Sequence, residues 1–218
     1  MLEMIQIKKY FKGKTVLDGI SLQVTDGEIV GLLGSNGSGK TTIFRILCGV
    51  YQADEGSIRI DGIPLELYKG KIGYVIEERN LYPGITVWEQ LLLTGKLKGM
   101  KKGKPEEEIS QWLEVFEIDR YKYWKICGLS KGNQQLVQII GGLLGNAKVV
   151  VLDEPFNGLD PENSKKLIRV LREYAKGRNI LVSMHQYEYV PYLLDRYYVM
   201  EEGKMTEEVV QTVTECSL

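Results

Sequence analysis

Gly34-Ser35-Asn36-Gly37-Ser38-Gly39-Lys40-Thr41-Thr42 is the stretch of this 218-residue sequence that decides its fold. It matches G-x-x-x-x-G-K-[ST], a pattern in which a glycine-rich turn holds nucleotide phosphates. The apolar run at residues 28–33 has the length of a buried strand, and residues 42–47 have the apolar spacing of a helix. This strand–loop–helix context favours phosphate binding over the alternative, a surface loop rich in glycine and serine.

Each residue type in residues 34–42 suits nucleotide binding. Glycines let backbone N–H groups approach a phosphate, and the N-terminus of a helix adds partial positive charge. Lys40 supplies a full positive charge for the terminal phosphates. The hydroxyl of Thr41 is an oxygen ligand of the kind that Mg²⁺ prefers. The whole stretch is therefore predicted to bind a nucleotide with Mg²⁺.

Composition limits the other function classes. Lys and Arg total 28 against 29 for Asp and Glu, a formal net charge of -1, so no nucleic-acid partner is expected. No apolar run approaches the roughly 20 residues of a membrane span. The cysteines Cys48, Cys127 and Cys216 match no disulfide or zinc spacing, and the first residues do not resemble a signal peptide. We expect a cytoplasmic protein that reaches a membrane only through a partner.

The pattern along the chain predicts an α/β fold. Alternating residues in 5–11, 15–17 and 21–24 indicate an antiparallel β layer. From residue 86 to about 116 the spacing is helical, with a break at 99–105, and a further helix opens at 128–132. The apolar runs 149–152 and 179–184 have the character of buried parallel strands. Ligands of such sheets lie at the carboxyl ends of the strands, where Asp153, Glu154 and the single histidine, His185, follow.

Three further segments carry a family resemblance. Val151-Leu152-Asp153-Glu154-Pro155 looks like a Walker B strand, Asn157-Gly158-Leu159-Asp160 is similar to a D-loop, and Leu129-Ser130-Lys131-Gly132-Asn133 resembles the signature L-S-G-G-Q. Together with the phosphate loop, they make nearly the whole chain resemble an ATP-binding-cassette (ABC) transporter ATPase. The resemblance implies a P-loop NTPase with a mostly parallel core, an antiparallel β layer and a helical subdomain. We expect residues 1–218 to form one ABC ATPase domain, with 1–82 and 145–218 as the nucleotide-binding core and 83–144 as the helical subdomain.

The resemblance also assigns roles to residues. Asp153 would hold Mg²⁺, Glu154 would polarise the attacking water, and His185 would contact the γ-phosphate. In such ATPases, the signature of one subunit completes the site of the other. Ser130 and Gly132 would therefore face ATP bound to a second subunit, in a head-to-tail pair expected to be a homodimer, with Asp160 at the interface. Lys131 and Asn133 depart from the common signature.

Glu77 is a second departure from the family pattern. Ile76-Glu77 stands where the family usually has Pro-Gln, and residues 76–83 look like the loop of exporters of the bacitracin-resistance and lantibiotic-immunity type. A glutamate can ligate Mg²⁺ but cannot donate a hydrogen bond when ionised. The resemblance thus implies an exporter with Glu77 near the metal.

An aromatic residue near the N-terminus is expected to stack on adenine. Phe11 aligns with the family position without a gap, Tyr10 would need one, and a strand aromatic buried in the core is the alternative. The sequence has no N-K-x-D motif for reading guanine, so ATP is the expected nucleotide.

We therefore predict an ATP-hydrolysing subunit of an exporter, attached to the inner face of the membrane through a separate integral membrane permease. Three alternatives remain open at this stage. They are an importer ATPase, a soluble ABC protein acting on ribosomes or DNA, and a regulatory module that binds nucleotide but hardly hydrolyses it.

Overall fold

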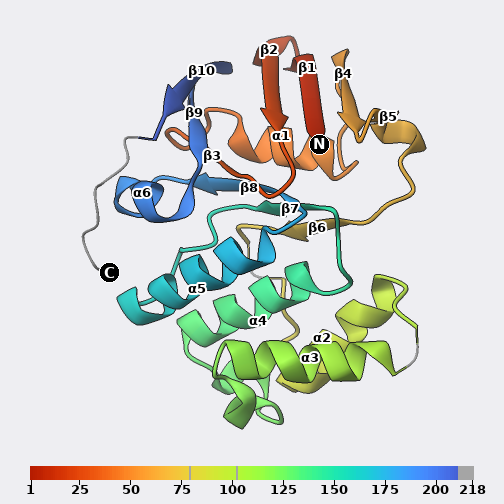
Figure 1. Cartoon of the computed structure of the whole chain (residues 1–218), viewed down its shortest axis with the longest axis vertical. Helices are drawn as coiled ribbons and strands as arrows, with labels where there is room; N and C mark the ends of the chain where they lie inside the picture. The colour runs from red at the N-terminus through yellow and green to blue at the C-terminus, as the bar shows by residue number, and fades with distance from the viewer. Residues whose placement is uncertain (79, 102, 211–218) are drawn as a thin grey trace.

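The computed structural model describes residues 1–78, 80–101 and 103–210, which form two sheets flanked by helices (Figure 1). The larger sheet has the order β10-β9-β3-β8-β7-β6. Its strands are β3 Ile29–Leu33, β6 Ile72–Val75, β7 Val149–Leu152, β8 Asn179–Met184, β9 Arg196–Glu201 and β10 Lys204–Val209. Every neighbouring pair is parallel except β9 with β10. The predicted, mostly parallel core is confirmed, while Cys216 and the rest of 211–218 lie outside the described residues.

The smaller sheet is the predicted antiparallel layer. Its strands are β1 Leu2–Phe11, β2 Lys14–Val24, β4 Glu55–Ile60 and β5 Ile63–Pro64, in the order β2-β1-β4-β5. β1 pairs with β2 through several register shifts, which explains why the alternation in the sequence is interrupted. Two strands were not predicted: β5 has only two residues, and four of the six residues of β10 are polar.

The helices lie on both faces of the large sheet (Figure 1). They are α1 Lys40–Leu47, α2 Val87–Leu97, α3 Lys104–Val115, α4 Lys131–Leu143, α5 Pro161–Tyr174 and the short α6 Val190–Leu193. α1 packs between the two sheets in one hydrophobic core, and α2 to α5 pack in a second core on the opposite face. None of the helices in the described ranges has both the length and the apolar character that a membrane span requires.

β7 shows how the two cores place the acidic residues. Val149 and Val151 belong to the core with α1, whereas Val150 and Leu152 belong to the core with α4 and α5. Successive side chains of a strand point to opposite faces, so a strand covered on both faces is apolar throughout. The carboxylates that follow Leu152 therefore emerge at the carboxyl end of the strand, at the same edge of the sheet as the end of β3.

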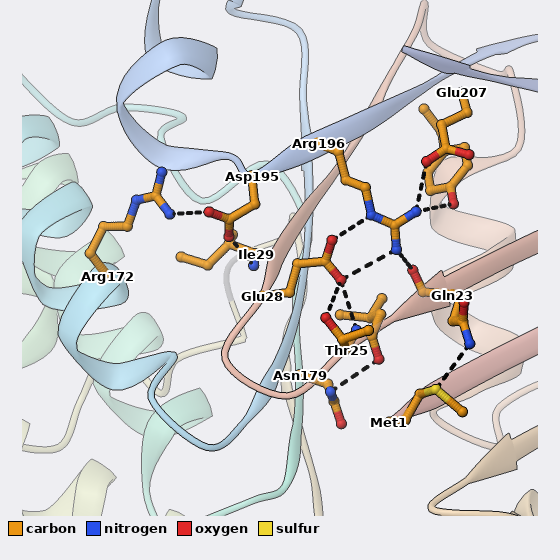
Figure 2. Close-up of polar contacts among 12 residues, drawn as sticks. Met1, Gln23, Thr25, Glu28, Ile29, Arg172, Asn179, Asp195, Arg196 and Glu207 are labelled. Atoms are coloured by element: carbon orange, nitrogen blue, oxygen red, sulfur yellow. Dashed lines mark hydrogen bonds and ion pairs between the residues drawn. The ribbon is translucent and has the colours of Figure 1, made fainter. Parts of the chain in front are cut away.

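A cluster of polar contacts around Arg196 ties the antiparallel layer to the large sheet (Figure 2). The guanidinium of Arg196 on β9 donates to Glu28, to the carbonyl of Gln23 and, at 2.7 Å, to Glu207. Burial raises the pKa of Glu28, but the hydrogen bonds from Arg196 and Thr25 outweigh it, so the pKa is lower than usual. The carboxylate is therefore held charged between the two sheets.

Candidate functional site

The phosphate loop joins the end of β3 to the start of α1, as predicted. Gly34, Gly37 and Gly39 have φ angles of 146°, 82° and 113°. A Cβ atom on Gly34 would lie 2.3 Å from the carbonyl oxygen of Met200, so no larger residue fits where the loop passes β9. The loop conformation is thus fixed by glycine at the points where the backbone turns.

The side chain of Lys40 bonds the backbone of this loop. Its ammonium donates to the carbonyls of Gly34, at 2.7 Å, and Ser35, at 3.1 Å, and the residue is only 6% exposed. These two bonds hold the positive charge over the loop at the N-terminus of α1. An anion bound by the loop would therefore meet both a full charge and backbone N–H groups.

Two buried carboxylates follow β7. Asp153 is 1% exposed and accepts a 2.6 Å hydrogen bond from the hydroxyl of Ser183 on β8. Glu154 is 5% exposed, and its Oε2 lies 2.8 Å from Nδ1 of His185. Among the described residues, Asp153 Oδ2 and Glu154 Oε1 have no hydrogen-bond partner. Since buried polar atoms normally have partners, these two oxygens point to a ligand at this place.

One cavity of about 600 Å³ brings the loop and the carboxylates together. Its lining consists of Phe11, Val16, Asn36, Gly37, Gly39, Lys40, Thr41, Thr42, Arg45, Tyr51, Glu77, Asp153 and Glu154. This lining includes the oxygen ligands of Thr41, Glu77, Asp153 and Glu154 and the aromatic rings of Phe11 and Tyr51. This combination fits a phosphate–metal group joined to a planar base.

Phe11 provides one of those rings. It is 38% exposed rather than buried in the core, and its ring lies edge-on to Tyr51 with centroids 5.2 Å apart. Tyr10 is absent from the cavity lining, and its hydroxyl donates to Glu55 at 3.1 Å. Of the two aromatics considered from the sequence, Phe11 is therefore the one that borders the cavity.

Comparison with known proteins identifies the family. The sequence model of the family described as "ABC transporter" matches residues 17–157. An uncharacterised ABC transporter ATP-binding protein of Methanocaldococcus jannaschii is 45% identical over 91% of this chain and 73% of its own length. The chain belongs to the ABC transporter family. It is an ATP-binding subunit, and the fold and family make it an ATPase.

Other proteins similar to this ABC ATPase are named for export and for import. The Nod factor export ATP-binding protein I of Paraburkholderia xenovorans is 34% identical over 95% of this chain and 70% of its own length. The methionine import ATP-binding protein MetN of Rhizobium etli is 33% identical over 95% of this chain and 60% of its own length. Among solved structures, a dimeric ATP-binding cassette in a post-hydrolysis state with ADP and Pi superposes with a TM-score of 0.86. It is 26% identical, and the match covers 97% of this chain and 99% of that one.

The predicted site residues of the ABC ATPase fall into two groups. Most of the loop, together with Phe11, Glu77, Asp153 and Glu154, lines the cavity. The residues outside its lining are Gly34, Ser35, Ser38, Ser130, Gly132, Asp160 and His185. Of these, the first three belong to the loop itself, and His185 reaches the cavity through its contact with Glu154.

The signature and D-loop residues form a separate surface. Ser130 is exposed and caps α4 by accepting from the backbone N–H of Asn133 at 3.2 Å. Asp160 caps α5 in the same way at 2.9 Å. The backbone at Gly158 lies against Gly132, where a Cβ atom would be 3.2 Å from the Gly158 oxygen. One chain therefore presents these residues together, away from its own cavity.

Several residues at the site were missed from the sequence, among them Ser183, Tyr51 and Arg45. Ser183 bonds Asp153 and also accepts from the backbone N–H of Glu154 at 2.9 Å. Tyr51 and Arg45 line the cavity and lie 3.3 Å apart, hydroxyl to guanidinium nitrogen. Ser183 left a signal, because it is a polar residue between apolar neighbours in the interior of β8. Tyr51 left none, since only the fold brings it next to Phe11.

Proposed function

We propose that this ABC ATPase drives export of a substrate through a separate membrane permease. The observation that carries the proposal is the cavity that joins the phosphate loop, Phe11, Glu77 and the two buried carboxylates. The proposal places ATP there, with the adenine on Phe11 and the phosphates on residues 34–42. The protein would then work on the inner face of the membrane, bound to its permease.

The cavity also suits Mg²⁺. Asp153 Oδ2 is buried with no partner among the described residues, and Thr41 and Glu77 line the same wall. Mg²⁺ commonly takes one or two carboxylates and completes its shell with phosphate oxygens and water. We assign Thr41, Asp153 and Glu77 to the metal. The ion, when bound, supplies positive charge that stabilises the phosphoryl group during transfer.

The remaining residues act on the attacking water and the γ-phosphate. Glu154 Oε1 accepts a proton from the water, while His185 holds Oε2 and so fixes the orientation of the carboxylate. His185 is half exposed at its side chain, which leaves it accessible to the γ-phosphate. Lys40 neutralises charge on the terminal phosphates. Glu154 and His185 follow the carboxyl ends of β7 and β8, and Lys40 is the first residue of the helix after the phosphate loop.

The second half of each site is assigned to a second subunit. Ser130, Gly132 and Asp160 lie together outside the cavity of their own chain, and Ser130 stands at the N-terminus of α4. In a head-to-tail pair of identical chains, this surface covers the ATP of the partner. The dimeric arrangement of a related cassette structure supports this proposal.

The direction of transport is assigned from Glu77. Relatives named for export and for import are about equally similar to this chain, so overall identity does not separate them. Glu77 occupies the position at which importers of the family usually have glutamine, and it lines the cavity. Glu77 therefore favours export, and import is the second candidate.

Co-purification of a Glu154→Gln variant tests the proposal. Loss of the proton acceptor is expected to lower turnover by about 10²–10⁴ while ATP still binds, which holds the complex in its closed form. We would extract membranes in mild detergent with Mg-ATP and identify the proteins that follow the tagged variant. A multi-span permease supports the transporter, and its fold separates export from import. Ribosomal proteins in its place, or nothing from the membrane fraction, contradict the proposal. Near-normal turnover of the variant contradicts the role assigned to Glu154.

A further inference from the structure

Two buried glutamines on α4 contact the two loops that carry the acidic residues of the site. Gln135 and Gln138 are three residues apart and lie on one face of the helix. Gln135 Nε2 donates to the carbonyl of Pro155 at 3.2 Å, immediately after Glu154. Gln138 reaches the loop that follows β6, which contains Glu77. One helix face therefore touches both loops.

Gln138 holds the backbone on both sides of Glu77. Its Nε2 donates to the carbonyl of Ile76 at 2.5 Å and to that of Glu78 at 3.1 Å. Its Oε1 accepts from the backbone N–H of Asn80 at 3.3 Å. Gln138 is 8% exposed, so these bonds form with little competition from water. The side chain of Glu77 is exposed and lines the cavity.

A third buried glutamine bonds the far end of the loop that contains Glu77. Gln90 on α2 is 6% exposed, and its Oε1 accepts from the backbone N–H of Tyr82 at 2.9 Å. The loop continues directly from β6 of the large sheet, and glutamines on α4 and α2 bond its backbone near both ends. Asp153 is attached to the sheet, because its backbone N–H donates to Val75 and its carboxylate bonds Ser183.

We propose that Gln138 is a positioning residue that sets where Glu77 lies relative to Asp153 and Thr41. The inference rests on the proposed function, in which Glu77 is a metal ligand. Because Gln138 lies on α4, the helix that Ser130 caps, a displacement of α4 moves the Glu77 backbone with it. The metal site thereby responds to the position of the signature helix through a single amide side chain.

Hydrogen exchange tests the structural half of the proposal without nucleotide or metal. Gln138→Met keeps the length of the side chain and its helix propensity but removes all three bonds. Peptides covering residues 76–82 are expected to exchange about tenfold faster than in wild type. Gln134→Met is the matched control, since Gln134 is on the same helix but donates to Ile126 and Leu129, at 3.1 and 3.2 Å. Its 76–82 peptides should exchange as in wild type.

The metal dependence of hydrolysis tests the functional half. In Gln138→Met, the half-saturating free Mg²⁺ concentration is expected to rise about tenfold, as for other residues that orient a ligand, with no change in Gln134→Met. Should Gln138→Met be too unstable to purify, Gln138→Glu keeps the acceptor for Asn80, lacks the donors for the two carbonyls, and gives the same readouts.

A Glu77→Ala variant measured in parallel separates the two levels of the proposal. If Glu77→Ala raises the Mg²⁺ requirement while the Gln138 variants leave both exchange and requirement unchanged, the positioning role is wrong and the proposed metal site stands. If Glu77→Ala leaves the requirement unchanged, Glu77 is not a metal ligand, and the proposed site and this inference both fail.

Discussion

Ser183 connects the two acidic residues of the site through one hydroxyl. It donates to the Asp153 carboxylate and accepts from the Glu154 backbone, and all three residues are buried. Glu154 has a φ of 48°, in the left-handed region that non-glycine residues seldom adopt. A hydrogen bond to its backbone N–H helps to hold that conformation. Ser183 therefore supports the geometry of Asp153 and Glu154, although it belongs to no sequence motif with them.

Replacing Ser183 by alanine is expected to lower the free energy of unfolding by about 2 kcal/mol, because a buried carboxylate and a buried N–H both lose their partner. Urea denaturation measures this. Ser164→Ala is the matched control, since Ser164 is fully buried and its hydroxyl has no partner among the described residues. The free energy of unfolding of Ser164→Ala should stay within about 0.5 kcal/mol of the wild-type value. Equal losses in the two variants would show that the Ser183 bonds contribute nothing.

At the scale of single elements, α2 begins with a capping box. Thr86 accepts from the backbone N–H of Glu89 at 3.2 Å, and the Glu89 carboxylate accepts from the backbone N–H of Thr86 at 2.8 Å. These bonds satisfy donors that a helix N-terminus otherwise leaves free. α2 follows directly from the Glu77 loop and carries Gln90, so the start of this helix also defines the end of the loop.

Thr86→Ala is expected to destabilise the protein by about 1 kcal/mol through loss of the cap. Thr94→Ala is the control on the same helix, because the Thr94 hydroxyl only donates to a carbonyl within that helix, that of Gln90 at 3.0 Å. Thermal unfolding of both variants checks the difference. A Thr94→Ala loss as large as that of Thr86→Ala would refute the role of the capping box.

At the scale of the whole molecule, the Arg196 cluster in Figure 2 links the sheets electrostatically. The Glu28 pKa is lower in the fold than in the unfolded chain, so the unfolded chain binds more protons as the pH falls. The stabilisation from Glu28 is therefore complete above the ordinary glutamate pKa, about 4.3, and is lost progressively below it.

Glu28→Gln should therefore be less stable than wild type at pH 7, and the gap should narrow as the pH falls from about 5 to 3. Urea midpoints measured across this range check the sign. Glu66→Gln is the control, since Glu66 is exposed and lies outside the cluster. A gap that stays constant with pH would mean that the Glu28 charge does not stabilise the fold.

The proposed pair of subunits makes a prediction about mixtures. Glu154→Gln and Ser130→Ala chains should each hydrolyse ATP poorly alone. In a head-to-tail heterodimer, one site carries both changes and the other carries neither. A 1:1 mixture should therefore recover about a quarter of the wild-type sites, assuming statistical pairing. Mixing Glu154→Gln with Lys40→Ala is the control, because every site then keeps one defect. No recovery in the first mixture would contradict the composite site.

What the sequence by itself determined lies in short, contiguous stretches. Residues 34–42 predicted a phosphate loop between β3 and α1, and the buried runs before Asp153 and His185 predicted parallel strands ending at one edge. These predictions succeeded because hydrophobic periodicity and glycine conformations are local properties of the chain. The division at residues 83 and 144 and the role of each site residue stay predictions.

What only the tertiary structure decided depends on contacts between distant segments. Phe11 meets Tyr51 across 40 residues, Ser183 meets Asp153 across 30, and Gln138 meets Ile76 across 62. Each contact needs the fold to close the intervening chain, and no local pattern records which buried polar residue will face which loop. The nucleotide loop could therefore be found in the sequence, whereas the residues that hold its surroundings in place could be found only in the folded protein.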